Sequence, residues 1–136
     1  MDLKYNSQQR QEYLKMTERN GLNWIEVFQG NVEFYSAPYW DLLTGMWKCG
    51  GPVRKTDATK LMKSVKSAQT AGKYVESAIQ HEFLHEVDNP KDARSKLLEL
   101  SADMQLRLDK FFDKAVDELI NAGGRVELAG PAPSDP

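Results

Sequence analysis

Residues 67–101 combine a helical pattern, two strand-like runs and the start of a further helix. Over residues 67–80 the apolar side chains Ala71, Val75 and Ala78 recur at the spacing of one helical face. The remaining surface is polar and carries Gln69, Thr70, Lys73 and Ser77. This pattern predicts a helix that packs through its apolar face and presents its polar face to a partner.

Two apolar runs follow this helix, at residues 83–87 and 95–100. The segment between them contains Asn89-Pro90 and two aspartates, which favour turns. The pattern therefore predicts a β-hairpin with a basic tip formed by Lys91 and Arg94. A helix followed by such a hairpin indicates a winged helix-turn-helix.

A helix is also predicted over residues 37–48. Ser36 is suited to the N-cap and Pro38 to the first turn. Trp40, Leu43 and Trp47 follow at helical spacing and are expected to form a buried aromatic stripe. A Cys-Gly-Gly-Pro sequence then ends this helix.

The next predicted helix covers residues 56–65, with Thr56 as its cap. Its apolar face is expected to consist of Ala58, Leu61, Met62 and Val65. The turn at Lys66-Ser67 then leads into the helix over residues 67–80, which would be the recognition helix.

The two ends of the chain are predicted to be helical as well. After Ser101, a suitable N-cap, apolar residues recur at helical spacing until Gly123-Gly124, which should end the helix. This stripe consists of Met104, Leu108, Phe111, Ala115 and Leu119, broadened by Phe112, Val116 and Ile120. At the other end, a helix over residues 7–20 is expected to break or kink at Asn20-Gly21, before an apolar patch at residues 22–28.

The width of the C-terminal stripe bears on assembly. It either packs over the N-terminal helices of the same chain or joins the helices of a second copy, and we favour a homodimer. The predicted fold is mainly α with a small β-hairpin wing: a winged helix-turn-helix domain over residues 1–127, flanked by dimerisation helices at about 7–33 and 102–122. The proline-containing tail, 128–136, is expected to be disordered.

Composition adds a charge asymmetry. The 136 residues suffice for one small domain, and their net charge is only −2. Residues 48–73 nevertheless contain seven basic side chains against Asp57 alone, a net charge of +6, so the remaining residues sum to −8. A positive field confined to one part of an acidic chain favours contact with nucleic-acid phosphates over an ordinary solvated surface.

The order of motifs resembles the MarR family of winged-helix transcriptional regulators over about residues 36–120. The resemblance is carried by the sequence TAGK at 70–73, by FL at 83–84, by DNPKDARSK at 88–96 and by the run from Leu97 to Ser101. Upstream, YWDLL at 39–43 is similar to the family's second helix and residues 56–65 to its third. Glu82 stands where the family usually carries glycine.

This resemblance implies a DNA-binding repressor that acts as a homodimer on a two-fold symmetric operator. It also makes a small aromatic molecule a candidate effector, bound between the dimerisation helices and the winged helix. Tyr35, Tyr39, Trp40 and Trp47 offer aromatic surface there, but core packing is the simpler explanation for them, so we assign no ligand site.

The expected DNA contacts divide by type. Gln69, Thr70 and Lys73 would lie nearest the base edges, whereas Lys63, Lys66 and Ser67 would hold phosphates. Lys91 and Arg94 would reach the backbone or minor groove from the wing. Asp92 would either orient Arg94 through a charge-assisted hydrogen bond or play a purely structural part.

One motif points to a different class of protein. His81-Glu82-Phe83-Leu84-His85 matches H-E-x-x-H, which on a helix binds zinc in metallopeptidases. The winged-helix interpretation instead places His85 in a strand, and no recognisable third ligand follows, so the zinc peptidase is the alternative that we rank lower.

We therefore predict a cytoplasmic DNA-binding regulator without catalytic activity, cofactor, metal or membrane segment. Double-stranded DNA and a second copy of the chain are the expected partners. A winged helix used only for protein contact also remains open, because Lys73 is the single positive charge on the recognition helix. The lone Cys49 receives no role.

Overall fold

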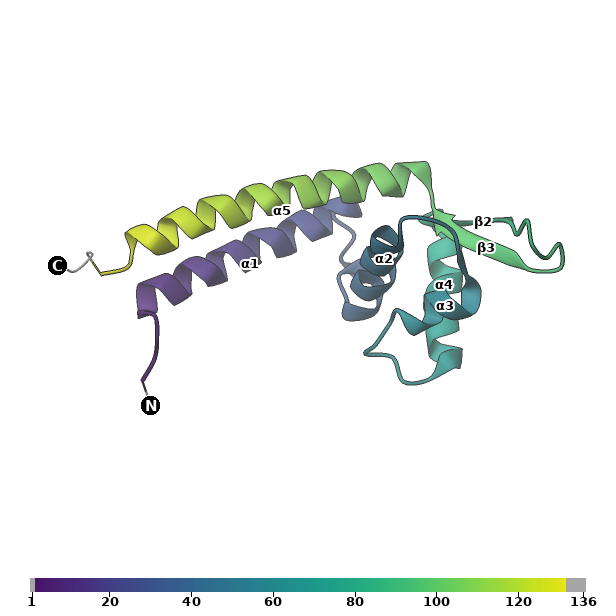
Figure 1. Cartoon of the computed structure of the whole chain (residues 1–136), viewed down its shortest axis with the longest axis horizontal. Helices are drawn as coiled ribbons and strands as arrows, with labels where there is room; N and C mark the ends of the chain where they lie inside the picture. The colour runs from purple at the N-terminus through teal and green to yellow at the C-terminus, as the bar shows by residue number, and fades with distance from the viewer. Residues whose placement is uncertain (1, 132–136) are drawn as a thin grey trace.

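The computed structural model describes residues 2–131 as a winged-helix body attached to a long two-helix arm (Figure 1). The arm pairs α1 (Ser7–Val27) with α5 (Ala102–Leu128). The body contains a short 3-10 helix (Val32–Phe34), α2 (Ala37–Cys49), α3 (Lys55–Lys60) and α4 (Ala68–Gln80). Its three strands are β1 (Val53–Arg54), β2 (Leu84–Asp88) and β3 (Lys96–Leu100). The predicted fold class is confirmed.

The sheet has the order β1-β3-β2, and both neighbouring pairs are antiparallel. Leu84 lies opposite Leu100 across the β2–β3 hairpin, and Val53 lies opposite Leu98 on the other edge. The hairpin was predicted, and each strand boundary lies within one residue of the observed one. Strand β1 was not predicted, because a two-residue strand carries no periodicity of its own.

The core lies where α2, α4, the sheet and the first half of α5 meet. Its most deeply buried side chains are Leu42, Leu43, Met46, Met62, Val75, Leu84, Leu98, Met104 and Leu108. Aromatic rings extend this core toward the arm, because Trp24 of α1 makes edge-on contacts with Trp40 and Phe111. Helix α4 is thereby fixed to the same core that anchors both arm helices.

The predicted stripe on α2 is only partly correct. Leu43 is buried, but Trp40 is 39% exposed and Trp47 is half-buried, because the face of α2 that meets the core is centred on Leu43 and Met46. Ser36 occupies the N-cap as predicted, yet its side chain makes no capping hydrogen bond.

The prediction for residues 56–65 was wrong in length. Helix α3 begins at Lys55, with Arg54 rather than Thr56 at its N-cap, and ends at Lys60. The chain then turns through hydrogen bonds such as Met62 N–H to Thr59 O, because this turn carries Met62 into the core.

Two glycine signals were also misread, because contacts with distant parts of the chain override them. Helix α1 runs through Asn20-Gly21 without a break, and Gly21 is packed so closely against Tyr35 that an added Cβ would lie 2.9 Å from the Tyr35 Oη. Helix α5 continues past Gly123-Gly124 to Leu128.

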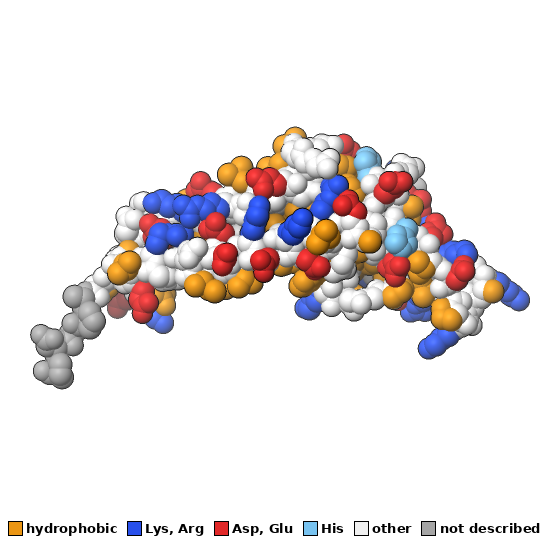
Figure 2. All heavy atoms as spheres, turned by 90° about the horizontal axis from the view of Figure 1, so that it is seen from above, with side chains coloured by type: hydrophobic (Ala, Val, Ile, Leu, Met, Phe, Trp, Pro, Cys, Tyr) orange, Lys and Arg blue, Asp and Glu red, His pale blue; other side chains and the backbone are white. Residues whose placement is uncertain are grey.

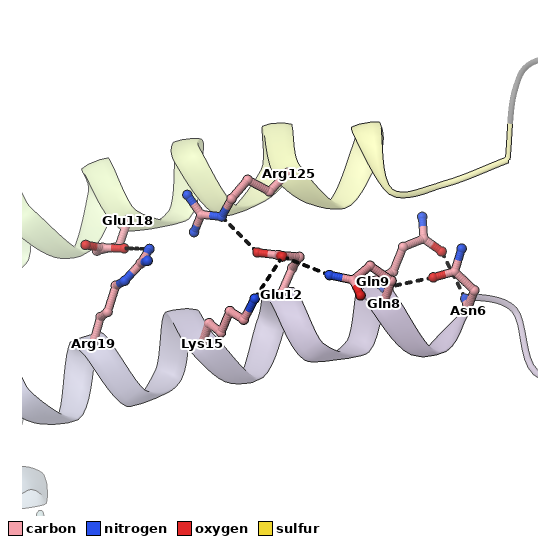
Figure 3. Close-up of polar contacts among 8 residues, drawn as sticks. All are labelled: Asn6, Gln8, Gln9, Glu12, Lys15, Arg19, Glu118 and Arg125. Carbon is pink, nitrogen blue, oxygen red and sulfur yellow. Dashed lines mark hydrogen bonds and ion pairs between the residues drawn. The ribbon is translucent and has the colours of Figure 1, made fainter.

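Polar contacts at the far end of the arm explain that continuation (Figure 3). Arg125 Nε donates to the buried Glu12 carboxylate at 2.9 Å, and Gln9 Nε2 donates to the Val126 carbonyl at 3.1 Å. Asn6 Nδ2 reaches the Ala129 carbonyl at 2.8 Å. The disordered tail was predicted to begin at Leu128, but Leu128 is the last residue of α5. Residues 132–136 of the predicted tail lie outside the described part of the chain.

The C-terminal stripe is divided between two environments. Met104, Leu108 and Phe111 are buried inside their own chain, whereas Leu119 and Ile120 are 60% and 66% exposed. The first half of the stripe therefore belongs to the intramolecular core, and only its second half offers apolar surface for another molecule.

Candidate nucleic-acid interface

Helix α4 is built to present a polar face. Ser67 is its N-cap, and the Ser67 Oγ accepts a hydrogen bond from the Thr70 backbone N–H at 3.3 Å. Ala71, Val75 and Ala78 pack into the core, as predicted. The position of α4 is further set by Tyr39, whose hydroxyl donates to the Ser77 Oγ at 2.8 Å, so Ser77 faces α2 rather than open solvent.

The predicted base-edge residues share the solvent side of α4. Gln69, Thr70 and Lys73 are all exposed. Glu76 lies on the same face, one helical turn beyond Lys73, and was missed because the charge count stopped at Lys73. Glu76 forms an ion pair with Lys55 at the start of α3. The three-residue spacing between Lys73 and Glu76 in a predicted helix could have shown from the sequence alone that the two side chains share a face.

The basic segment keeps most of its charge free. Among residues 2–131, only two of the seven basic residues of this segment form ion pairs: Arg54 with Asp57 and Lys55 with Glu76. The Asp57 carboxylate raises the pKa of Arg54. The other five basic residues of the segment are exposed and form no ion pair with a described residue: Lys48, Lys60, Lys63, Lys66 and Lys73. Lys63 and Lys66 lie in the turn between α3 and α4, shortly before α4 begins.

The wing carries two more basic side chains, Lys91 and Arg94, in the loop between β2 and β3, and both are exposed. The hairpin projects away from the arm (Figure 1), and Figure 2 shows Lys and Arg side chains at that end of the molecule. Asp92 Oδ1 accepts from the Arg94 backbone N–H at 3.0 Å, so its observed hydrogen bond shapes the turn rather than orienting the guanidinium.

An ion pair lies at the loop end of the hairpin, where β2 ends and β3 begins. Lys96 contacts the Asp88 carboxylate directly across from it, which lowers the pKa of Asp88 and raises that of Lys96. On the face of the arm seen in Figure 2, acidic and basic side chains are intermingled, and several of the arm's charges are paired, as Arg19 is with Glu118 and Lys114 with Glu26. The arm thus has the mixed charge of an ordinary solvated surface, whereas the helix-turn-helix and wing tip carry unpaired positive charge.

The H-E-x-x-H segment does not have zinc-site geometry. His81 is the C-cap of α4, Glu82 adopts a left-handed φ of 61°, and His85 lies in β2. The His81 ring nitrogen contacts the Ser77 carbonyl at 2.8 Å, while His85 Nε2 contacts Glu99 Oε1 at 2.8 Å across the hairpin. Across residues 2–131, no three metal-ligating side chains converge. The two imidazoles therefore cannot share one helical face.

A cavity of about 660 Å³ lies beside the helix-turn-helix. Trp40 and Trp47 line it, together with Phe112, Lys48 and Lys63. The Trp47 and Phe112 rings contact each other in a tilted arrangement, with centroids 4.3 Å apart. Of the four aromatic residues considered from the sequence, Trp40 and Trp47 line this cavity, Tyr35 lines two smaller ones, and Tyr39 is buried in the core.

Among residues 2–131, no helix has an apolar stretch long enough to cross a bilayer. Comparison of the sequence with family models and with curated proteins gave no match. Similarity is found among solved structures.

A mutant of MepR from S. aureus bound to an oligodeoxyribonucleotide superposes with a TM-score of 0.56 at 12% identity, over 82% of this chain and 78% of that one. A probable transcriptional regulator from Pseudomonas aeruginosa gives 0.52 at 18% identity, over 81% and 78% of the two chains. BpsR from Bordetella bronchiseptica, whose DNA binding is regulated by 6-hydroxynicotinic acid, gives 0.50 at 14% identity, over 90% and 84%. The chain therefore has the winged-helix fold of the MarR-type transcriptional regulators.

Proposed function

We propose that this protein is a MarR-family transcriptional regulator that binds double-stranded DNA as a homodimer and acts as a repressor. The observation that carries the proposal is the run of unpaired lysines along the turn and the exposed face of α4, on a fold that DNA-bound MepR shares. Unpaired surface cations beside a recognition helix are suited to neutralise phosphates.

Each predicted contact has a role in this proposal. Lys63 and Lys66 bind phosphates beside the groove, and Lys91 and Arg94 do so from the wing. Gln69, Thr70 and Lys73 reach base edges, where Gln pairs with adenine and Lys with guanine. Ser67 caps α4 with its oxygen, which leaves its hydroxyl hydrogen free to donate to a phosphate.

The first prediction tests DNA binding directly. Affinity for duplex DNA should fall steeply with salt, and Lys73→Ala should weaken binding without changing the circular dichroism spectrum, because Lys73 is exposed and makes no ion pair with another described residue. Binding is measured by fluorescence anisotropy over a salt series. Lys114→Ala, which removes a lysine paired with Glu26 on the arm, is the matched control and should leave affinity unchanged. Wild-type protein that fails to bind duplex DNA at low salt would contradict the proposal.

We further propose that an aromatic carboxylate releases the protein from DNA by entering the 660 Å³ cavity. Trp40, Trp47 and Phe112 supply aromatic walls. Lys48 and Lys63 supply positive charge for the carboxylate, which exceeds the single negative charge of Asp41 in the lining. Because Lys63 is also a proposed phosphate contact, a bound anion would withdraw that lysine from DNA. The regulation of BpsR by an aromatic acid supports this mode of control.

The second prediction uses benzoate as the probe. Benzoate should quench tryptophan fluorescence and lower DNA affinity, and Lys48→Gln should weaken both effects, because Lys48 lines the cavity. Lys60→Gln removes an exposed lysine that does not line it and serves as the control. An identical benzoate response in wild type and Lys48→Gln would argue against this cavity as the effector site.

A further inference from the structure

The face of α4 that would enter the major groove carries a single carboxylate. Gln69, Lys73 and Glu76 lie at i, i+4 and i+7 and are all exposed, so they share one face. Glu76 is paired with Lys55, and their side chains are 51% and 48% exposed. The ion pair therefore lies at the surface, where solvent and an approaching duplex can both reach it.

A carboxylate in this position opposes DNA binding at most sequences. It repels phosphates and accepts hydrogen bonds without donating any. In the major groove, guanine and thymine offer it acceptors, and adenine places the N7 acceptor beside its amino group. Cytosine alone offers an amino donor with no acceptor next to it, so a groove-facing carboxylate is stabilised chiefly opposite cytosine.

Lys55 has an alternative partner once DNA is bound. In the free protein it neutralises Glu76, but a nearby phosphate competes for the same ammonium group. If Lys55 turns to the phosphate, Glu76 is left unpaired in a groove of acceptors, which is costly unless a base donates to it. The exchange links a phosphate contact to the identity of a base.

We propose that Glu76 is a specificity-determining residue that selects cytosine at the base pair it faces and penalises other bases there. This inference rests on the DNA-binding function proposed above. Lys55 holds Glu76 paired until the duplex is engaged. Part of the specificity of this recognition helix thus comes from a residue that rejects wrong sites rather than from one that attracts all DNA.

The ion pair has a structural alternative, namely a clamp between α3 and α4. Exposed ion pairs contribute little to stability, and these helices are already joined through the buried Ala58, Ala71 and Val75. The two roles differ in one observable. A clamp changes stability without changing the preferred base, whereas a base-reading carboxylate changes the preferred base.

The test is selection of bound duplexes from a randomised pool, followed by sequencing. Wild-type protein should enrich cytosine at one position in each half-site. Glu76→Gln should lose this enrichment in favour of adenine, because glutamine both donates and accepts, and discrimination at that position should fall roughly fivefold to a hundredfold. Affinity of Glu76→Gln for unselected DNA should rise, since one repulsive charge is gone.

Two control variants separate the explanations. Lys55→Met should lower overall affinity but retain the cytosine preference, and Glu33→Gln, which removes an exposed carboxylate outside the helix-turn-helix, should change neither. If Glu76→Gln selects the same bases as wild type, or if it and Lys55→Met lose stability alike with unchanged selection, the pair is a clamp and the inference is wrong. Wild-type protein that binds no duplex DNA at low salt would instead refute the proposed function, and this inference with it.

Discussion

At the scale of single residues, Glu82 shows how the fold imposes backbone geometry against side-chain preference. It follows the end of α4 with a φ of 61°, and its N–H donates to the Ile79 carbonyl at 3.0 Å while the Phe83 N–H donates to the Ala78 carbonyl at 2.9 Å. These bonds end the helix in the manner of a left-handed C-terminal turn. The position suits glycine, which explains why the MarR-type pattern carries glycine there.

The third prediction follows from this strain. Glu82→Gly should raise the free energy of unfolding by about 1 kcal/mol, because a left-handed conformation is costly for any residue with a Cβ and the side chain makes no ion pair with another described residue. Urea unfolding measures the change. Glu86→Gly, the same substitution at an exposed position in β2, should destabilise instead. A loss of stability in both variants would show that the left-handed turn stores no strain.

At the scale of elements, the arm is held together at its far end by a buried carboxylate. Glu12 is 7% exposed, and its oxygens accept from Arg125 at 2.9 Å, Gln8 at 3.2 Å and Lys15 at 3.4 Å (Figure 3). The hydrogen bond from Arg125 is the main reason that the pKa of Glu12 is lowered. Helix α1 and the last turns of α5 are therefore joined through charge.

The fourth prediction concerns the pH dependence of this junction. A carboxyl with a lowered folded-state pKa stabilises the fold above its ordinary value of 4.5, and this contribution is lost as pH falls through the folded-state pKa. Arg125→Met should therefore lower the melting temperature at neutral pH and flatten its decline below pH 4.5. Lys114→Met, which breaks the exposed 3.4 Å pair with Glu26, should have little effect. Equal losses in the two variants would mean that the buried pair has no special role.

At the scale of the whole molecule, the apolar surface of α5 bears on assembly. Val116, Leu119 and Ile120 lie within two turns of the helix and are all exposed. Phe111 lies in the core between Trp24 and Trp40, so a charge placed there would disrupt the fold before it could report on a dimer. The exposed trio is the informative place to test association of two copies.

The fifth prediction uses this distinction. Leu119→Asp should yield a monomer by light scattering that keeps its helical content, because Leu119 is exposed in the single chain and a charge at a subunit interface opposes association. Operator affinity should fall with it, since a monomer presents one recognition helix. Leu106→Asp, near the other end of α5, is the control and should remain dimeric. A wild-type monomer that binds a two-fold symmetric site as tightly would contradict the homodimer.

The sequence by itself determined most of the secondary structure of this protein, through local patterns of side chains. Periodicity predicted α4, caps at Ser67 and Ser101 marked the starts of two helices, and the turn-forming residues 88–94 predicted the hairpin, because the hydrogen bonds that make these features join residues close in the chain. The basic segment likewise marked the candidate DNA-binding surface.

Contacts between distant segments decided the rest. Helix α5 continues past Gly123-Gly124 because Glu12 and Gln9 bind its last turns, and α1 passes Gly21 because Trp24 is drawn into the core beyond it. The pairing of Glu76 with Lys55 is of the same kind. A single sequence records propensity and periodicity, but such long-range contacts exist only after the chain has folded, and at these positions their free energy exceeds the local preference.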